Sequence, residues 1–223
     1  MKYLVTGANR GIGLELVRQL VAAGHDVIAT ARDPGSAEEL ASLGVRIEPL
    51  DTSDAASVAA FAGALGGEAI DVLINNAGIG TIEGSGLAET DLEQLLGLFN
   101  VNSIGPMRVT QALLPNLRAG SGRTVVQMSS ILGCIADAGA GMFGYRASKS
   151  ALNMLNRTLS VELEGEGFTC VAMHPGWVQT DVGGAAATLS PAESVAGMVE
   201  VIAGLDTSHN GGFLDYQGET LPW

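Results

Sequence analysis

The chain has little of what extracellular scaffolds, membrane proteins and nucleic-acid binders need. Two cysteines in 223 residues exclude a disulfide framework and favour a reducing compartment. Only 11 basic residues stand against 24 acidic ones, and a net charge of −13 argues against nucleic-acid or anionic membrane partners. No apolar run reaches membrane-spanning length, and no signal-like basic and apolar pair precedes the first strand-like run. We therefore expect a cytoplasmic protein without nucleic-acid or membrane partners.

Short apolar runs alternate with helix-like stretches along the chain. The strand-like runs are "KYLVT", "DVIAT", "VRIEPL", "DVLIN", "RTVVQMS", "FTCVAMH" and "GGFLDY", and the longest helix-like stretches are 88–118 and 143–164. Near-continuous apolar strands separated by helices predict an α/β fold with a doubly wound parallel sheet, covered by helices on both faces. No repeat or low-complexity linker divides residues 1–223, so we expect a single domain.

The first turn, "TGANRGIG", carries glycines at positions 7, 11 and 13. It is not a Walker loop, because Ile12 stands where the second glycine belongs and no lysine follows. It also differs from Gly-x-Gly-x-x-Gly. However, the glycines lie where a strand meets a helix N-terminus, which offers free N–H groups and partial positive charge to a phosphate. A dinucleotide loop is the favoured interpretation, and a tight turn without a ligand is the alternative.

Tyr145 and Lys149 stand four residues apart at the start of a predicted helix, so both side chains emerge on one face. An ammonium close to a phenol favours the phenolate and lowers the pKa of the phenol. Such a tyrosine can pass a proton to or from a substrate oxygen. The alternative is a surface tyrosine beside a solvated lysine.

Six motifs, in order, resemble those of the short-chain dehydrogenase/reductase family: "TGANRGIG", "NNAG", "VNSIG", "MSS", "YRASK" and "HPGWVQT". The chain looks closest to small carbonyl-reductase and C-factor-like members, whose chains end much like "GGFLDYQGETLPW". The resemblance implies a Rossmann-type fold in which residues 1–120 mainly bind cofactor and residues 121–223 supply the catalytic and substrate-binding part. It also implies hydride transfer between a nicotinamide and a small carbonyl or alcohol substrate, by a homodimer or homotetramer.

The resemblance also implies four catalytic residues. Tyr145 would be the acid/base, and Lys149 would lower its pKa and hold the nicotinamide ribose. Ser130 would hydrogen-bond the substrate carbonyl oxygen, with Ser129 as the alternative, because the interval from Ser130 to Tyr145 is two residues longer than the family's usual one. Asn102 would distort its helix and anchor a proton-relay water; its alternative role is to cap a kink.

Cofactor choice depends on the end of the second strand, where an acid binds the ribose 2′-hydroxyl of NAD or an arginine takes the 2′-phosphate of NADP. The family's acidic position falls on Ala31, and Arg32 follows it. Arg10 matches a second basic mark of NADP-preferring members. Asp33 is the residue that would instead suit NAD. NADP(H) is favoured, and NAD(H) is possible.

The remaining cofactor contacts follow from the same motifs. They are Gly7, Asn9, Gly11, Ile12 and Gly13 in the first turn, Asp51 and Thr52 beside the adenine, Asn75, Ala77 and Gly78 along the adenosine side, and Pro175, Gly176, Val178 and Thr180 at the nicotinamide. The substrate pocket is expected from 79–91, 131–144 and 181–190, whose few charges suit an uncharged, moderately apolar carbonyl compound. No histidine has a metal-ligand partner at a useful spacing, so no metal is expected.

Two other functions compete with this interpretation. A serine hydrolase would pair Ser130 with His174 or His25, but the sequence lacks Gly-x-Ser-x-Gly. A non-catalytic NAD(P)-binding sensor or signalling protein of the C-factor type is the stronger alternative. The intact Ser130, Tyr145 and Lys149 favour an enzyme, because a sensor could lose its acid/base without losing cofactor affinity.

Overall fold

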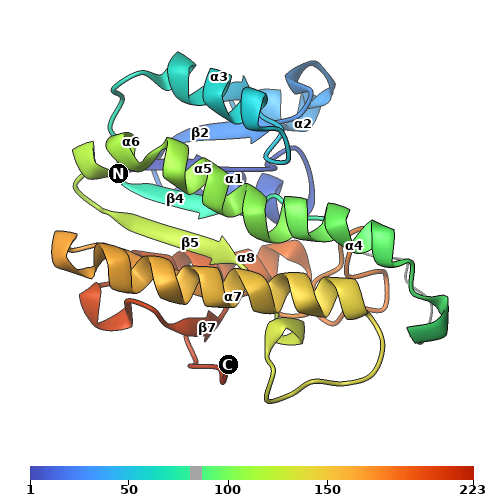
Figure 1. Ribbon diagram of the computed structural model, residues 1–223. Coiled ribbons are helices and arrows are strands. Elements are labelled where there is room, and N and C mark those ends of the chain that lie inside the picture. Colours follow the sequence, from blue (N-terminus) through green and yellow to red (C-terminus); the bar gives the residue numbers. More distant parts are fainter. Residues whose placement is uncertain (81–86) are drawn as a thin grey trace.

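A computed structural model describes residues 1–80 and 87–223. Seven parallel strands form one sheet in the order β3-β2-β1-β4-β5-β6-β7 (Figure 1). The strands are β1 Lys2–Val5, β2 Asp26–Ala31, β3 Arg46–Pro49, β4 Val72–Asn75, β5 Thr124–Met128, β6 Thr169–His174 and β7 Phe213–Asp215. Strand order reverses between β1 and β4, which creates a crevice at the carboxyl ends of the strands. The predicted doubly wound α/β fold is confirmed.

Helices cover both faces of the sheet (Figure 1). They are α1 Gly11–Ala22, α2 Glu38–Ala41, α3 Ala55–Leu65, α4 Leu92–Phe99, α5 Gly105–Ala112, α6 Leu114–Ala119, α7 Phe143–Leu163 and α8 Pro191–Ala203. Alternate residues of β1 point to opposite faces: Tyr3 and Val5 pack with α1 and α8, whereas Leu4 packs with α3, α5 and α7. The sheet is therefore buried on both sides, as its apolar strands predict. None of the helices in the described ranges has the length and apolar character needed to cross a bilayer.

The long helical region expected over 88–118 is interrupted. A π-helical turn over Asn100–Ile104 separates α4 from α5, and α6 begins after Leu113. Pro106 and Pro115 stand in the first turns of α5 and α6. Proline has no N–H to donate to the preceding turn, so an uninterrupted α-helical ladder cannot pass either position. The interruption bears on function, because Asn102 lies inside the π-helical turn.

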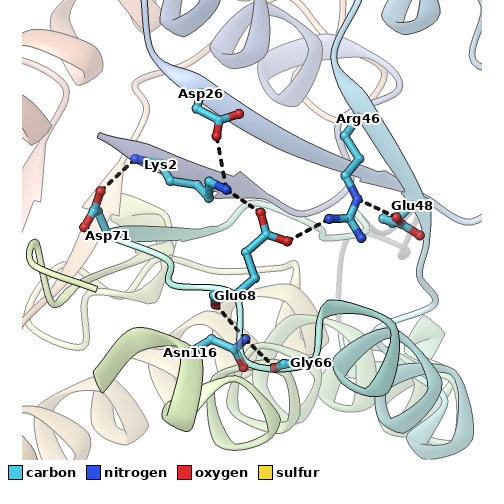
Figure 2. Close-up of polar contacts among 8 residues, drawn as sticks. All are labelled: Lys2, Asp26, Arg46, Glu48, Gly66, Glu68, Asp71 and Asn116. Carbon is cyan, nitrogen blue, oxygen red and sulfur yellow. Dashed lines mark hydrogen bonds and ion pairs between the residues drawn. The ribbon is translucent and has the colours of Figure 1, made fainter. Parts of the chain in front are cut away.

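The amino ends of the strands are tied together by a charged network around Lys2 (Figure 2). The Lys2 ammonium lies 3.1 Å from Asp26 and also pairs with Glu68. Arg46 contacts both Glu48 and Glu68 at 2.7 Å. The hydrogen bond from Lys2 lowers the pKa of Glu68, so this carboxylate stays charged at neutral pH. The network links β1, β2 and β3 to the turn after α3, at the edge opposite the crevice.

Candidate active site

A cavity of about 1060 Å³ lies at the carboxyl edge of the sheet. It is lined by loops that follow several strands, which is where ligands bind in doubly wound sheets. The residues expected at the site that line it are Gly7, Asn9, Arg10, Gly11, Ile12, Gly13, Arg32, Asp51, Thr52, Ala77, Gly78, Tyr145, Lys149, Pro175 and Thr180. Asn75, Asn102, Ser130, Gly176 and Val178 lie outside this lining.

The first turn has no room for side chains at its glycines. Gly7 and Gly11 have φ of +63° and +55°, a region that L side chains rarely adopt. A Cβ on Gly13 would lie 2.3 Å from the Gly7 carbonyl oxygen and 2.5 Å from Asn76 Nδ2. The turn therefore brings the N-terminus of α1 against the chain after β1, and the first residues of the helix, Gly11, Ile12 and Gly13, line the cavity.

Asn76 braces this turn and was not singled out in the sequence. Its Nδ2 donates to the carbonyl oxygens of Thr6 at 2.9 Å and Gly7 at 3.0 Å, and the residue lines the cavity. Its neighbour Asn75 is buried in β4 and donates to Thr110 Oγ1 at 3.0 Å. Successive residues at the end of a strand point in opposite directions, so only one of the two asparagines in "NNAG" reaches the cavity.

Both arginines proposed for the 2′-phosphate line the cavity. Arg10 precedes α1 and forms an ion pair with Asp181, in the segment after β6. Asp33 Oδ1 accepts the Gly35 N–H at 3.0 Å, which caps the short 3₁₀ turn that follows. The Asp33 carboxylate is therefore partly engaged in local structure. Hydrogen bonds from Ser53 lower the pKa of Asp51, with smaller contributions from Arg32 and Arg108.

Tyr145 and Lys149 begin α7 and share one face of it. Lys149 Nζ lies 5.7 Å from the centre of the Tyr145 ring and donates to the Met128 carbonyl oxygen at 2.7 Å. Burial lowers the pKa of Lys149 to about 8. Burial also raises the pKa of Tyr145, and a hydrogen bond with Ser130 opposes that rise. The expected lowering of the Tyr145 pKa by Lys149 is not found, because the cost of desolvating the phenolate dominates.

The two serines of "MSS" make different contacts. The Ser129 hydroxyl lies 2.5 Å from Asn153 Oδ1, and both side chains are buried. The Ser130 hydroxyl accepts the Leu132 N–H at 3.2 Å and bonds the Tyr145 hydroxyl. Ser129 lines the cavity and Ser130 does not, yet Ser130 is the serine whose hydroxyl reaches Tyr145.

Asn102 is fully buried and joins the π-helical turn to the chain after β4. Its Oδ1 accepts the Ile79 N–H at 2.9 Å, and its Nδ2 donates to the Ile79 carbonyl oxygen at 3.0 Å and to Ser148 Oγ at 3.1 Å. A Cβ on Gly78 would lie 3.3 Å from Asn102 Oδ1 and 3.6 Å from Lys149 Nζ. Asn102 and Lys149 thus both lie close to the position that a Gly78 side chain would occupy.

The segment after β6 divides into residues that line the cavity and residues that shape it. Pro175 and Thr180 line it. A Cβ on Gly176, which has φ +82°, would lie 2.4 Å from Leu189 Cδ1, and Val178 pairs with Leu189 in an isolated bridge. Gly176 and Val178 therefore fold the segment back on itself.

Further lining residues were not singled out individually in the sequence. They are Ser36, Leu50, Ser53, Ile79, Val101, Met128, Gln179, Asp181, Val182 and Pro191. Ile79, Asp181 and Val182 belong to segments expected to form the substrate pocket. Val101, Met128 and Gln179 lie within the quoted motifs, and Leu50 and Ser53 adjoin Asp51 and Thr52, so their place in or beside a motif was the signal that could have identified them. Ser36 and Pro191 carried no such signal. Residues 81–86, including Glu83 of the expected pocket, lie outside the described residues.

Neither a metal centre nor a hydrolase triad is apparent in the described ranges. No group of three or more His, Cys, Asp or Glu side chains within residues 1–80 and 87–223 is placed to hold a metal ion. Burial lowers the pKa of His174 to about 4, so its imidazole is neutral at physiological pH. The hydroxyl of Ser130 bonds Tyr145 and the Leu132 N–H, which is not the Ser–His arrangement of a hydrolase.

Comparisons with known proteins agree with the motifs and the fold. The family model for short chain dehydrogenase matches residues 2–188. C-signal of Myxococcus xanthus is 48% identical over 155 residues, which span 69% of this chain and 93% of that protein. NADPH-bound carbonyl reductase from chicken fatty liver has a TM-score of 0.93 at 36% identity, covering 100% of this chain and 98% of the other. Carbonyl reductase Sniffer of D. melanogaster has a TM-score of 0.93 at 34% identity, covering 100% and 99%. The chain therefore belongs to the short-chain dehydrogenase/reductase family of NAD(P)H-dependent oxidoreductases.

Proposed function

We propose that this protein is an NADP(H)-dependent carbonyl reductase that acts on a small carbonyl or alcohol substrate. One observation carries the proposal: the cavity that begins at the glycine turn and Arg32 also contains Tyr145 and Lys149, and Tyr145 is hydrogen-bonded to Ser130. A dinucleotide site and a proton donor thus share one cavity. The likeness to carbonyl reductases over the whole chain supports the same activity.

The residues present fit a dinucleotide with a 2′-phosphate. Because Gly13 has no Cβ to clash with the Gly7 carbonyl oxygen, the start of α1 packs against the turn, where its free backbone N–H groups would bind a pyrophosphate. Arg10 and Arg32 line the same cavity and would take the 2′-phosphate by charge-assisted hydrogen bonds. The NADPH bound by the chicken relative supports this choice. Asp33 would accept the ribose hydroxyl of NAD, which is the alternative cofactor.

The chemistry follows from the positions of Tyr145, Ser130 and Lys149. When bound, NADPH supplies the hydride that reduces the carbonyl carbon. Tyr145 donates its proton to the carbonyl oxygen, and Ser130 donates a hydrogen bond to that oxygen as negative charge develops there. Burial raises the pKa of Tyr145, so the phenol is protonated at neutral pH and ready to act as the acid.

Lys149 and Asn102, which both lie beside Gly78, would support this proton transfer. The buried Lys149 ammonium would stabilise the phenolate that Tyr145 leaves behind, and together with a water bound by Asn102 it would resupply the proton. Met128 holds Lys149 Nζ in place through its carbonyl oxygen.

We also infer a single domain over residues 1–223 and a homodimer or homotetramer in the cytoplasm.

A panel of aldehydes and ketones, assayed with NADPH and with NADH, tests the proposal. We expect NADPH oxidation by the wild type and a loss of at least about a hundredfold in kcat for Tyr145→Phe, because a positioned general acid contributes on that order. Tyr145→Phe should still bind NADPH. Lack of turnover by the wild type across the whole panel would contradict the proposal.

A non-catalytic signalling role is the second candidate, and the 48% identity to C-signal favours it. In that case the dinucleotide would be bound and not turned over. The same experiment separates the two functions, because a sensor binds NADPH, oxidises none of it and is indifferent to Tyr145→Phe.

A further inference from the structure

The segment 220–223 lies beside β7 (Figure 1). It also contacts the loop between Ser130 and Tyr145. The Leu221 N–H donates to the Phe213 carbonyl oxygen at 2.7 Å. The Trp223 ring stacks on Phe213, with centroids 5.4 Å apart and an angle of 25° between the planes. The Ala136 N–H donates to the Trp223 carbonyl oxygen at 3.1 Å. Trp223 therefore connects β7 to the loop between Ser130 and Tyr145.

The near end of this loop is packed firmly against Lys149. A Cβ on Gly133 would lie 2.8 Å from the carbonyl carbon of Lys149, and Ser150 Oγ donates to the Gly133 carbonyl oxygen at 2.8 Å. Cys134 is buried against Phe213, the same ring on which Trp223 stacks. Residues up to Cys134 are thus fixed by the core.

The following residues, 135–140, are exposed. Within this segment, the Ala136 N–H donates to the Trp223 carbonyl oxygen, which lies outside the loop. The Ala138 N–H donates to the Ile135 carbonyl oxygen, which lies inside it. The loop ends at Met142, whose φ of +53° is unfavourable for a non-glycine residue, and α7 with Tyr145 begins at once. Strain of this kind persists only where surrounding contacts hold the chain in place.

We propose that Trp223 is a positioning residue for the substrate side of the site. It holds Ala136, and thereby the conformation of the loop between Ser130 and Tyr145, the two residues that would contact the substrate carbonyl oxygen. The proposal rests on the carbonyl-reductase function given above. Because the glycine turn and Arg32 lie on other elements, loss of this hold should affect the substrate and leave the dinucleotide untouched.

Trp223→Ala tests the proposal, with two controls. Trp223→Phe keeps a ring on Phe213, and Met154→Ala removes a side chain that is 66% exposed on α7, away from the loop. We expect Trp223→Ala to lower kcat/KM for a carbonyl substrate about tenfold, chiefly through KM, because small displacements of positioning groups cost rate on this scale. The dissociation constant of NADPH should change less than about twofold. Trp223→Phe should retain most of the activity, and Met154→Ala all of it.

Amide hydrogen exchange gives a readout that does not depend on turnover. Exchange of the 134–142 peptide should rise at least about tenfold in Trp223→Ala and stay near the wild-type rate in both controls. Unchanged exchange in this peptide, or an unchanged KM, would overturn the proposal. So would a loss of NADPH affinity equal to the loss in kcat/KM, since that indicates general destabilisation. A wild type without carbonyl turnover refutes the proposed function instead, and exchange then decides the loop contact by itself.

Discussion

Replacing Gly13 with alanine tests the close contact between α1 and the turn that precedes it. The added Cβ would lie 2.3 Å from the Gly7 carbonyl oxygen and 2.5 Å from Asn76 Nδ2, so something must move. Overpacking of this kind costs about 1–3 kcal/mol. Displacing the Asn76 amide also weakens its bonds to Thr6 and Gly7, at about 1 kcal/mol each. Higher helix propensity returns about 1 kcal/mol. The net loss in unfolding free energy should be about 2–4 kcal/mol.

Gly63→Ala is the matched control, because Gly63 lies within α3 and a Cβ there meets nothing within 4 Å. It should stabilise the protein by about 0.5–1 kcal/mol. Urea unfolding followed by far-UV circular dichroism measures both variants, and fluorescence titration with NADPH shows whether Gly13→Ala also loses the cofactor. If the unfolding free energy of Gly13→Ala lies within about 0.5 kcal/mol of the wild-type value, the turn can accept a Cβ and the expected clash does not exist. Equal destabilisation by Gly63→Ala would show that the close contacts are not the cause.

Three further predictions concern charged groups. Arg10→Ala should weaken NADPH binding about tenfold or more and NADH binding much less, because one charge-assisted bond to the 2′-phosphate is lost; equal losses in fluorescence titrations would leave the turn to the pyrophosphate alone. Lys2 lowers the pKa of Glu68 below its ordinary 4.5, so the stabilisation from this carboxylate is present above about pH 4.5 and is lost as pH falls through the folded pKa. The unfolding free energies of wild type and Glu68→Gln, measured with urea, should therefore converge in acid. A difference that stays constant with pH would contradict this. Burial lowers the pKa of Lys149 from 10.5 to about 8, so the charged form of this side chain destabilises the fold. The unfolding free energy of the wild type should therefore rise relative to that of Lys149→Met between about pH 8 and 10.5. A difference independent of pH would show that the ammonium is well solvated.

Much of the fold could be predicted because its signals are local. Each strand is a short apolar run bounded by turn residues, and each was located in the sequence close to its position in the sheet. The helix-like stretch "SAEELASLG" contains only the short α2, Glu38–Ala41, because Pro34–Ser36 forms a 3₁₀ turn before it. The helical pattern of 88–118 also continues across Pro106 and Pro115. In the structure, α5 begins just before Pro106, after the π-helical turn, and α6 begins just before Pro115.

The site divides in the same way. Positions defined by one motif and one turn, such as Gly7, Gly11 and Gly13, could be assigned from their spacing. The choice between Ser129 and Ser130 could not, because both hydroxyls face α7 and only the folded chain shows that Ser129 meets Asn153 whereas Ser130 meets Tyr145. The pKa of Tyr145 likewise depends on burial, which no spacing of residues expresses.

The sequence by itself determined the order of strands and helices along the chain, the glycine turn after the first strand and the Tyr145–Lys149 pair, since each follows from residues a few positions apart. Only the tertiary structure decided that Asn76 braces that turn, that Asn102 and Lys149 both lie beside Gly78, and that Trp223 holds Ala136. Asn76 stands 69 positions from Gly7 along the chain, and Trp223 stands 87 positions from Ala136. Such contacts exist only after the sheet has brought distant segments together, so no local pattern encodes them.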